Sequence, residues 1–444
     1  AILGSNPSAP AKKMEKLSKN KNFFYKIKKI FFPFYKSKNI KKLFYVLEAN
    51  QKKNNQVAMF VGGCVRKFLT GENIDDIDIA TTFSPKEIKE KFKDSEFKII
   101  DTGIDHGSVT AVIDSTKFEI TTLRKDVETD GRHAEVSFTD DWQQDSERRD
   151  FTINAIYMDI RGKIYDPQNG KYDLKQRKIK FIGDPALRIE EDYLRIIRFI
   201  RFSIYYNSKQ SDPKTIECIK LNLNGIKNIS KERILSELYK IFQIKKINNI
   251  LENKDIKNIF SVIFPELKYI DRIENFCHLL EANIINQSPE LIFSILLIDE
   301  KDNFEYFAHK YKISNKLKKD LNFIANNFKK FKNEKNYLKK DLKKNIYKLK
   351  KNNIKKLIAF IYCADKTFSF TVLNKIINDI NKVNIPNFPF NGKYLIEQGL
   401  QDGKKIGFAL KELEKEWIEN NFSLKTQEVI SIIDKIKKLQ ILNI

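Results

Sequence analysis

The feature that most limits how this chain can fold is a short apolar run that ends in two glycines and precedes two carboxylates. Val57–Val61 has the composition of a buried strand, and Gly62-Gly63 leads directly into a turn of helix. Asp76 and Asp78 then flank an isoleucine at the start of a second apolar run. Residues two apart on a strand face the same side, so these carboxylates are expected to converge. The order strand, turn, helix and strand predicts an α/β unit.

The chemistry of this segment points to nucleotidyl transfer. Gly62 and Gly63 let the backbone approach a triphosphate closely, and Arg66 in the following helix would neutralise its charge. Asp76 and Asp78 carry the oxygen ligands that Mg²⁺ prefers. One metal ion would lower the pKa of an attacking hydroxyl and another would hold the triphosphate, so we expect a two-metal Mg²⁺ site. Glycine turns and acidic strand ends are each common, but their combination in this order is specific.

A further carboxylate on a neighbouring strand is expected to complete the metal site. The best candidate is Glu119, within the β-rich run Lys117–Thr122, and we predict a catalytic role for it. An exposed glutamate that merely faces a neighbouring strand is an equally good interpretation. Asp75 precedes the carboxylate pair, and its side chain is expected to face solvent.

A second polar segment lies just before another apolar run. Arg148 and Arg149 are followed by Asp150 and, four residues later, by Asn154. Arginine is well suited to binding a triphosphate, and the other two side chains could hold the triphosphate or the ribose hydroxyls. All of them are therefore predicted to bind the nucleotide, with Arg149 also counted as catalytic. The alternative is a salt-bridged start of a strand.

A third segment, Glu190–Arg201, combines acids with regularly spaced arginines. Asp192 and Arg195 are three apart and would be neighbours on a helix. The carboxylate could accept from the exocyclic amine of C or A, while the guanidinium donates to a ring nitrogen; U and G present the opposite polarity. The alternative is an ordinary intrahelical ion pair. Arg198 continues the stripe, whereas Arg201 would lie on roughly the opposite face.

The pattern of apolar residues changes along the chain from one typical of strands to one typical of helices. Between residues 57 and 164 short β-rich runs predict a mixed sheet, and from Glu190 onwards apolar residues recur three and four apart, which predicts helices. The predicted strands are Val57–Val61, Ile77–Ala80, Lys98–Asp101, Ser108–Ile113, Lys117–Thr122 and Asn154–Asp159, and the predicted early helices are Val65–Leu69 and Pro85–Lys93. Breaks between the later helices are expected near 222–230, 264–266, 288–290 and 384–392.

The charge of the chain favours a polyanionic partner. Lys and Arg number 82 against 58 Asp and Glu, a net charge of +24, although a genome biased toward Lys codons would also raise it. The 4 cysteines are scattered, which disfavours a zinc site and suits a reducing compartment. No apolar run is long enough to cross a membrane, so we expect no membrane association. The dense Lys/Asn run 316–356 is either a solvated helical face or an RNA track.

These segments together resemble the class II tRNA nucleotidyltransferases (CCA-adding enzymes) and the related bacterial poly(A) polymerases. The resemblance covers residues 56–245 most clearly and is weaker over 399–417. It rests on Val61–Arg66, Asp76–Thr81, Arg148–Ala155, Tyr165–Pro167, Phe181–Pro185, Glu191–Arg195 and Ser230–Ile234. Lys67 departs from the pattern, because the family often has Asp there.

The resemblance implies an α+β fold with a polymerase-beta-like nucleotidyltransferase head followed by an all-helical neck, body and tail. The segments would be a basic N-terminal arm (1–45), head (46–165), neck (166–245), RNA-binding body (246–380) and tail (381–444). The first 13 residues look like an added linker, and Met14 is a plausible native start. We expect a cytoplasmic protein, with organellar targeting left open.

The resemblance also implies a reaction, namely the addition of C, C and A to tRNA 3′ ends from CTP and ATP without a nucleic-acid template. Asp76 and Asp78 would hold Mg²⁺. Gly63, Arg66 and one arginine of the 148–149 pair would bind the triphosphate. Base selection would fall to the segment after residue 190, in which Asp192 and Arg195 pair with the base, Arg198 and Arg201 lie nearby and Glu191 stabilises the helix.

The choice within the family depends on two loops. Residues 102–110 resemble the tRNA enzymes rather than the arginine-rich pattern of the poly(A) polymerases, and the loop 124–133, which the family links to the switch from CTP to ATP, looks intact. We therefore favour full CCA addition. A poly(A) polymerase, a CC-adding or A-adding enzyme, and a catalytically silent RNA-binding protein remain the alternatives. The oligomeric state is left undetermined.

Overall fold

The structure is a computed structural model that describes residues 33–51, 56–104, 107–129, 134–334, 337, 340–400 and 403–438. The chain divides into two compact units, Ala1–Phe264 and Pro265–Ile444. This division falls within the segment 246–380 that the sequence predicts as the body. The finer boundaries at residues 165, 245 and 380 stay predictions.

The first unit contains a mixed seven-stranded sheet. Its order is β3-β4-β5-β2-β1-β8-β9; β2 pairs with β5 in parallel, and the other pairs are antiparallel. The strands are β1 (Ala58–Val61), β2 (Asp78–Thr81), β3 (Lys98–Gly103), β4 (Ser108–Ile113), β5 (Thr116–Thr122), β8 (Tyr157–Met158) and β9 (Ile164–Tyr165). The prediction of a mixed sheet in this half of the chain is confirmed.

Two predicted strands begin later than the sequence pattern indicated. β2 starts at Asp78, so Asp76 lies in the approach to the strand. The run Asn154–Asp159 contains only the short β8, because Thr152–Asn154 forms a 3₁₀ turn. Conversely, the loop after β5 forms a separate hairpin of β6 (Arg124–Thr129) and β7 (Ala134–Phe138). The tip of that hairpin, residues 130–133, lies outside the described residues.

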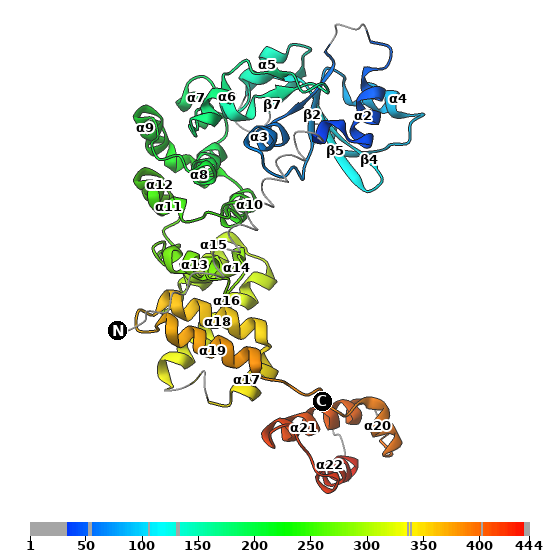
Figure 1. Cartoon of the computed structure of the whole chain (residues 1–444), viewed down its shortest axis with the longest axis vertical. Coiled ribbons are helices and arrows are strands. Elements are labelled where there is room, and N and C mark those ends of the chain that lie inside the picture. The colour runs from blue at the N-terminus through cyan, green and yellow to red at the C-terminus, as the bar shows by residue number, and fades with distance from the viewer. Residues whose placement is uncertain are drawn as a thin grey trace, which may run out of the picture. The chain divides into compact units, whose positions relative to one another are not determined.

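Helices α2 (Lys38–Glu48), α3 (Gly63–Thr70) and α4 (Pro85–Phe92) pack against the sheet. Figure 1 shows these helices beside the strands of the sheet. All four residues of β1 are buried, which is typical of a central strand covered on both faces. The ring of Phe60 on β1 lies 4.8 Å from that of Phe44 on α2. The sheet therefore has a continuous apolar core behind the strand that leads to the glycine turn.

The expected basic arm does not extend to residue 45, because α2 begins at Lys38 and packs against the sheet. Four apolar residues of α2 recur at helical spacing and are buried, namely Ile40, Leu43, Phe44 and Leu47. Phe34, in the 3₁₀ turn Phe34–Lys36, also packs against Phe60, with ring centroids 4.9 Å apart. The rest of the expected arm, up to residue 32, lies outside the described residues.

The remainder of the first unit is helical, and from α8 onwards this agrees with the helices predicted from Glu190. The helices are α5 (Trp142–Glu147), α6 (Gly170–Lys175), α7 (Pro185–Glu191), α8 (Leu194–Tyr206), α9 (Pro213–Asn222), α10 (Lys231–Phe242), α11 (Asn249–Glu252) and α12 (Lys254–Ile263). The break expected near 222–230 is occupied by a 3₁₀ helix, Leu223–Asn228. Helices α8 and α10 pack against each other, and α7 packs against α9. This packing brings residues from α7, α8 and α10 into one neighbourhood.

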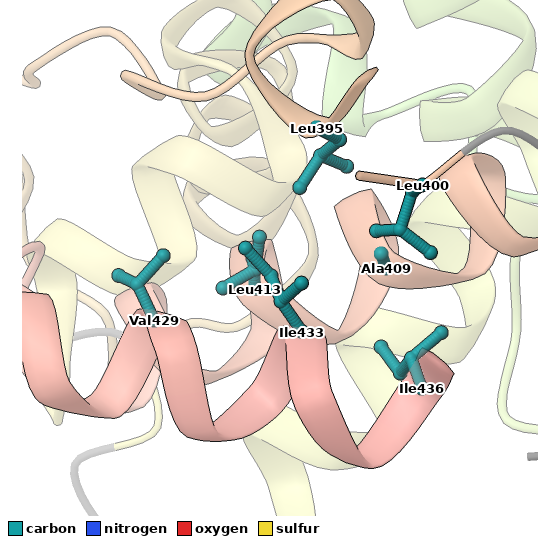
Figure 2. Close-up of a cluster of buried hydrophobic side chains, with 7 residues drawn as sticks. All are labelled: Leu395, Leu400, Ala409, Leu413, Val429, Ile433 and Ile436. Atoms are coloured by element: carbon teal, nitrogen blue, oxygen red, sulfur yellow. The ribbon is translucent and has the colours of Figure 1, made fainter. Parts of the chain in front are cut away.

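The second unit is also helical. Its helices are α13 (Arg272–Glu281), α14 (Pro289–Leu297), α15 (Asn303–Tyr311), α16 (Asn315–Asn333), α17 (Leu342–Leu349), α18 (Lys351–Ala364), α19 (Phe370–Lys382), α20 (Gly392–Glu397), α21 (Gly403–Glu419) and α22 (Thr426–Lys438). Figure 2 shows apolar side chains of α20, α21 and α22 directed toward one another; the buried set is Leu395, Leu400, Ala409, Leu413, Val429, Ile433 and Ile436. Among the described helices, none combines the length and apolar composition of a membrane span.

Candidate active site

The first unit contains a cleft of about 1620 Å³ between the glycine turn of the sheet and helices α8 and α10. All the site residues predicted from the sequence line this cleft: Gly62, Gly63, Arg66, Asp76, Asp78, Glu119, Arg148, Arg149, Asp150, Asn154, Asp192, Arg195, Arg198 and Arg201. They come from segments up to 139 positions apart (201 − 62), so their convergence is a product of the fold. Their individual roles stay predictions.

The carboxylates gather at one wall of the cleft. Asp78 at the start of β2 lies opposite Glu119 on β5 in the parallel pairing. Burial, together with the negative charges of Glu119 and Asp76, raises the pKa of Asp78 to about 6. Glu119 is exposed, but it is exposed into the cleft. The geometry thus favours the prediction of a third acid over the alternative of an unrelated surface glutamate.

These acids are suited to holding a divalent cation. The negative charges of Glu119 and Asp76 disfavour the ionised form of Asp78, and a bound cation would offset this repulsion. Among the described residues, no three His, Cys, Asp or Glu side chains are already arranged as a complete ligand set. Water and phosphate oxygens commonly supply the remaining Mg²⁺ ligands, so a carboxylate pair is a sufficient protein contribution.

The glycine turn places a helix start directly beside the carboxylates. Gly62 has φ 68° and ψ −121°, a conformation that side chains disfavour, and α3 begins at Gly63. A Cβ atom added to Gly63 would lie 3.7 Å from Oδ2 of Asp78. The buried thiol of Cys64 contacts the carbonyl oxygen of Asp78 at 3.5 Å. The first turn of α3, whose N–H groups have no partner within a helix, therefore lies next to the acids, as a phosphate site requires.

A chain of polar contacts joins Arg66 on α3 to Arg198 on α8. Arg66 donates to Oδ1 of Asn154, and its Nε donates to the Tyr206 hydroxyl at 3.1 Å. Asn154 donates to Oδ1 of Asp150 at 2.5 Å, and Oδ2 of Asp150 lies 2.6 Å from Nη2 of Arg198. Burial opposes ionisation of Asp150, but Arg198 and the amide of Asn154 outweigh it and lower its pKa. Asp150 and Asn154 thus position arginines at the cleft wall.

Arg148 and Arg149 share a partner that the sequence analysis missed. Asp145 on α5 is 1% exposed, and its two oxygens lie 2.9 Å from Arg148 and 2.9 Å from Arg149. The Tyr157 hydroxyl also donates to it, at 2.7 Å. Burial disfavours the charged form, but Arg149 and Arg148 hold the pKa of Asp145 well below its usual range. The salt bridge considered as an alternative is therefore present, yet both arginines still face the cleft.

Asp192 and Arg195 do not form the intrahelical pair that the spacing suggested. Asp192 lies between α7 and α8 in extended conformation, with φ −156°, so no continuous helix runs through it. Its Oδ1 accepts from the N–H of Leu194 at 3.1 Å, and its Oδ2 accepts from Arg233 at 2.7 Å. Arg195 pairs instead with Glu191. The local hydrogen bond from the N–H of Leu194 to the Asp192 carboxylate offers the backbone an alternative to helical bonding, which agrees with the break.

Glu191 joins the two arginines that flank it in sequence. It pairs with Arg188 at 2.5 Å and with Arg195, and Arg188 donates to the carbonyl oxygen of Arg149 at 2.9 Å. The expectation that Glu191 stabilises this segment agrees with these contacts. Arg188 was missed because its contacts with the backbone of Arg148 and Arg149 span 40 and 39 positions, and sequence spacing gives no sign of such contacts.

Arg201 lines the cleft although helical geometry placed it opposite Asp192. The expectation failed because Asp192 is not on the same helix. Nε of Arg201 lies 2.6 Å from Oε2 of Glu237 on α10, which is 2% exposed. Lys240 on α10 also pairs with Glu237, at 2.8 Å. The far wall of the cleft is therefore a basic surface anchored by one buried acid.

Comparisons with known proteins decide the family. The Poly A polymerase head domain model matches residues 58–180, and a model described as "Probable RNA and SrmB-binding site of polymerase A" matches residues 211–270. The CCA tRNA nucleotidyltransferase 1, mitochondrial, of Danio rerio is 32% identical over 397 residues, which is 86% of this chain and 88% of that protein. The chain belongs to the CCA-adding tRNA nucleotidyltransferase family. The family resemblance seen in the sequence is confirmed.

Other members of the CCA-adding family agree with this assignment. The human mitochondrial CCA tRNA nucleotidyltransferase 1 is 34% identical over 396 residues, again 86% of this chain and 88% of that protein. The Bacillus stearothermophilus CCA-adding enzyme, solved in complex with CTP, has the same fold, with a TM-score of 0.64 at 21% identity over 90% of this chain and 98% of that chain. The predicted α+β fold, a mixed sheet followed by helices, is that of the CCA-adding enzymes.

Proposed function

We propose that this protein adds C, C and A to the 3′ end of tRNA from CTP and ATP, with release of pyrophosphate. The named activity of the relatives supports the proposal. The observation that carries it is the presence in one cleft of an acidic wall at Asp78 and a polar pair, Asp192 and Arg195, suited to a base edge. Chemistry and base selection can then occur on the same bound nucleotide.

The acidic wall would act on the reacting hydroxyl and the α-phosphate. Asp76 and Asp78 would hold Mg²⁺, with Glu119 beside them; the bound metal ion would activate the hydroxyl and neutralise charge on the triphosphate. The N–H groups at the start of α3 and the Arg66 guanidinium would orient the phosphates. Arg149, fixed through Asp145, would offset the negative charge that develops on the leaving pyrophosphate.

The opposite wall would choose the base. Asp192 offers acceptor oxygens and Arg195 offers donors, which matches the amine and ring nitrogen of C or A. Asp192 is fixed by Arg233, and Arg195 is fixed by Glu191. Asp192 and Arg195 therefore do not pair with each other, and both can contact a base. Arg198 and Arg201 lie along the same wall and would contact the nucleotide or the RNA end.

A comparison of RNA substrates tests this function against a poly(A) polymerase. A tRNA transcript without its 3′ CCA and an unstructured RNA of equal length would each be incubated with labelled CTP or ATP. We expect C incorporation on the tRNA and little on the unstructured RNA. Extension of both RNAs by A alone would favour the poly(A) polymerase, and binding without extension would favour the silent RNA-binding alternative.

We also propose tRNA as the partner and consider where in the cell the protein acts. The net charge of +24 supports tRNA as the partner, and the helical body 246–380 is proposed to bind it. The cytoplasmic location stays a prediction, and the mitochondrial names of the relatives keep organellar targeting open. Imaging of the tagged protein beside a mitochondrial marker would decide between the two locations.

A further inference from the structure

Arg233 on the first turn of α10 holds the carboxylate of Asp192. Its Nη2 donates to Oδ2 of Asp192 at 2.7 Å, across 41 positions of sequence. The backbone N–H of Leu194 donates to the other oxygen at 3.1 Å. Both oxygens of the carboxylate are thus fixed by donors from different elements, which leaves the side chain with one orientation.

The two residues differ in their relation to the cleft. Asp192 lines the cleft, whereas Arg233 is not one of the described residues that line it. An ionised carboxylate can accept about four hydrogen bonds, and these contacts use one on each oxygen. Lone pairs therefore remain for a ligand in the cleft, and Arg233 need not leave when a nucleotide binds.

Helix α10, which carries Arg233, is held in place at its start and along its length. Ser230 caps the helix by accepting from the N–H of Arg233, and α10 packs along α8. Ile234, the next residue, is buried. The base of the Arg233 side chain is therefore set by the packed core, while its guanidinium reaches the turn between α7 and α8.

We propose that Arg233 is a positioning residue for nucleotide selection, which fixes Asp192 as the acceptor for the exocyclic amine of C or A. This inference rests on the proposed function, in which Asp192 reads the base. Without Arg233, the carboxylate could rotate about its side-chain torsions, and its distance to the amine would vary. The discrimination between an amine and a carbonyl at that position of the base would then fall.

The test measures kcat/KM for CTP and for UTP on a tRNA transcript without its 3′ CCA. Arg233→Gln should lower the CTP to UTP ratio about tenfold, which corresponds to about 1.4 kcal/mol. Arg233→Lys keeps one donor and should retain part of the ratio. Arg161→Gln, at an exposed arginine outside the cleft wall, is the matched control and should leave the ratio unchanged. Thermal melting of each variant would report folding.

Asp192→Asn separates failure of this inference from failure of the proposed function. If Asp192→Asn lowers the ratio and Arg233→Gln does not, the positioning role is overturned and base reading by Asp192 stands. If neither variant changes the ratio, both are overturned. An equal loss of kcat/KM for CTP and UTP in Arg233→Gln would assign Arg233 a purely structural role. If Arg233→Gln does not fold, the ratio in Arg233→Lys decides, and a wild-type ratio there would contradict the inference.

Discussion

Asp78 on β2 and Glu119 on β5 lie directly opposite each other in the one parallel strand pair among the described strands. Antiparallel strands flank this pair on both sides, β1 beside β2 and β4 beside β5. The pairing sets the two acids at one wall of the cleft, where burial and like charge raise the pKa of Asp78 to about 6. A site with this electrostatic character attracts a cation.

Removal of the metal-binding acid should abolish chemistry but not RNA binding. Asp78→Asn is expected to lower nucleotide incorporation by about 10³-fold, since a metal ion contributes several kcal/mol of charge stabilisation. Incorporation of labelled CTP and filter binding of tRNA would be measured together. Asp75→Asn is the matched control, because Asp75 pairs with Lys67 on α3. Substantial activity in Asp78→Asn would contradict the metal assignment.

Loss of Asp145 should destabilise the sheet unit. Asp145→Asn would leave the half-buried Arg148 and Arg149 without their shared charge, and breaking such a pair costs about 3–5 kcal/mol. Urea denaturation at pH 7 would measure the loss. The prediction fails if the free energy of unfolding at pH 7 changes by less than about 1 kcal/mol.

The contribution of Asp145 should also depend on pH. Its pKa is lowered in the folded state, so its stabilising effect is present above the unfolded pKa of about 3.9 and is lost as the pH falls toward the folded value. The stability difference between wild type and Asp145→Asn should therefore shrink below about pH 4. A difference that stays constant from pH 7 to pH 3 would show that the charge of Asp145 is not what stabilises the fold.

The two glycines of the turn should respond differently to substitution. Gly62→Ala forces a side chain into φ 68°, so it should reduce stability by about 1–3 kcal/mol. Gly63→Ala meets only an ordinary contact of 3.7 Å with Asp78, so it should fold normally but raise KM for CTP by crowding the phosphate position. Thermal melting and steady-state kinetics would separate these effects. Equal melting temperatures for the two variants would contradict the conformational argument.

Binding of tRNA should weaken steeply with salt. A chain of net charge +24 that contacts several phosphates is expected to lose about 10³-fold or more in affinity between 50 and 200 mM salt. Fluorescence anisotropy with labelled tRNA would measure this dependence. A flat response would argue against an electrostatic track along the helical segments.

The sequence predicted the cleft well where the signal is local. The glycine turn, the acids that follow it and the arginine pair at 148–149 each lie within a few residues of an apolar run, and the structure brings all of them to one cleft. The partners of these residues could not be predicted in the same way. Arg233 reaches Asp192 across 41 positions, and Arg188 reaches Arg149 across 39, because packing of separate helices creates both contacts.

Local chemistry also misled the sequence analysis in two places. Asp192 was placed on a helix from its spacing, but it lies in the extended link between α7 and α8, where its carboxylate accepts from the N–H of Leu194. The expected basic arm extended to residue 45, whereas a buried apolar stripe fixes α2 to the sheet.

The most direct test of the account is the extension of a tRNA transcript that lacks its 3′ CCA, in the presence of Mg²⁺ and each of the four labelled nucleotides. Sequencing-gel resolution would count and order the residues added. The account predicts two C, then one A, and then a stop, with little use of UTP or GTP. A lengthening A ladder, or a product that ends after CC, would contradict it.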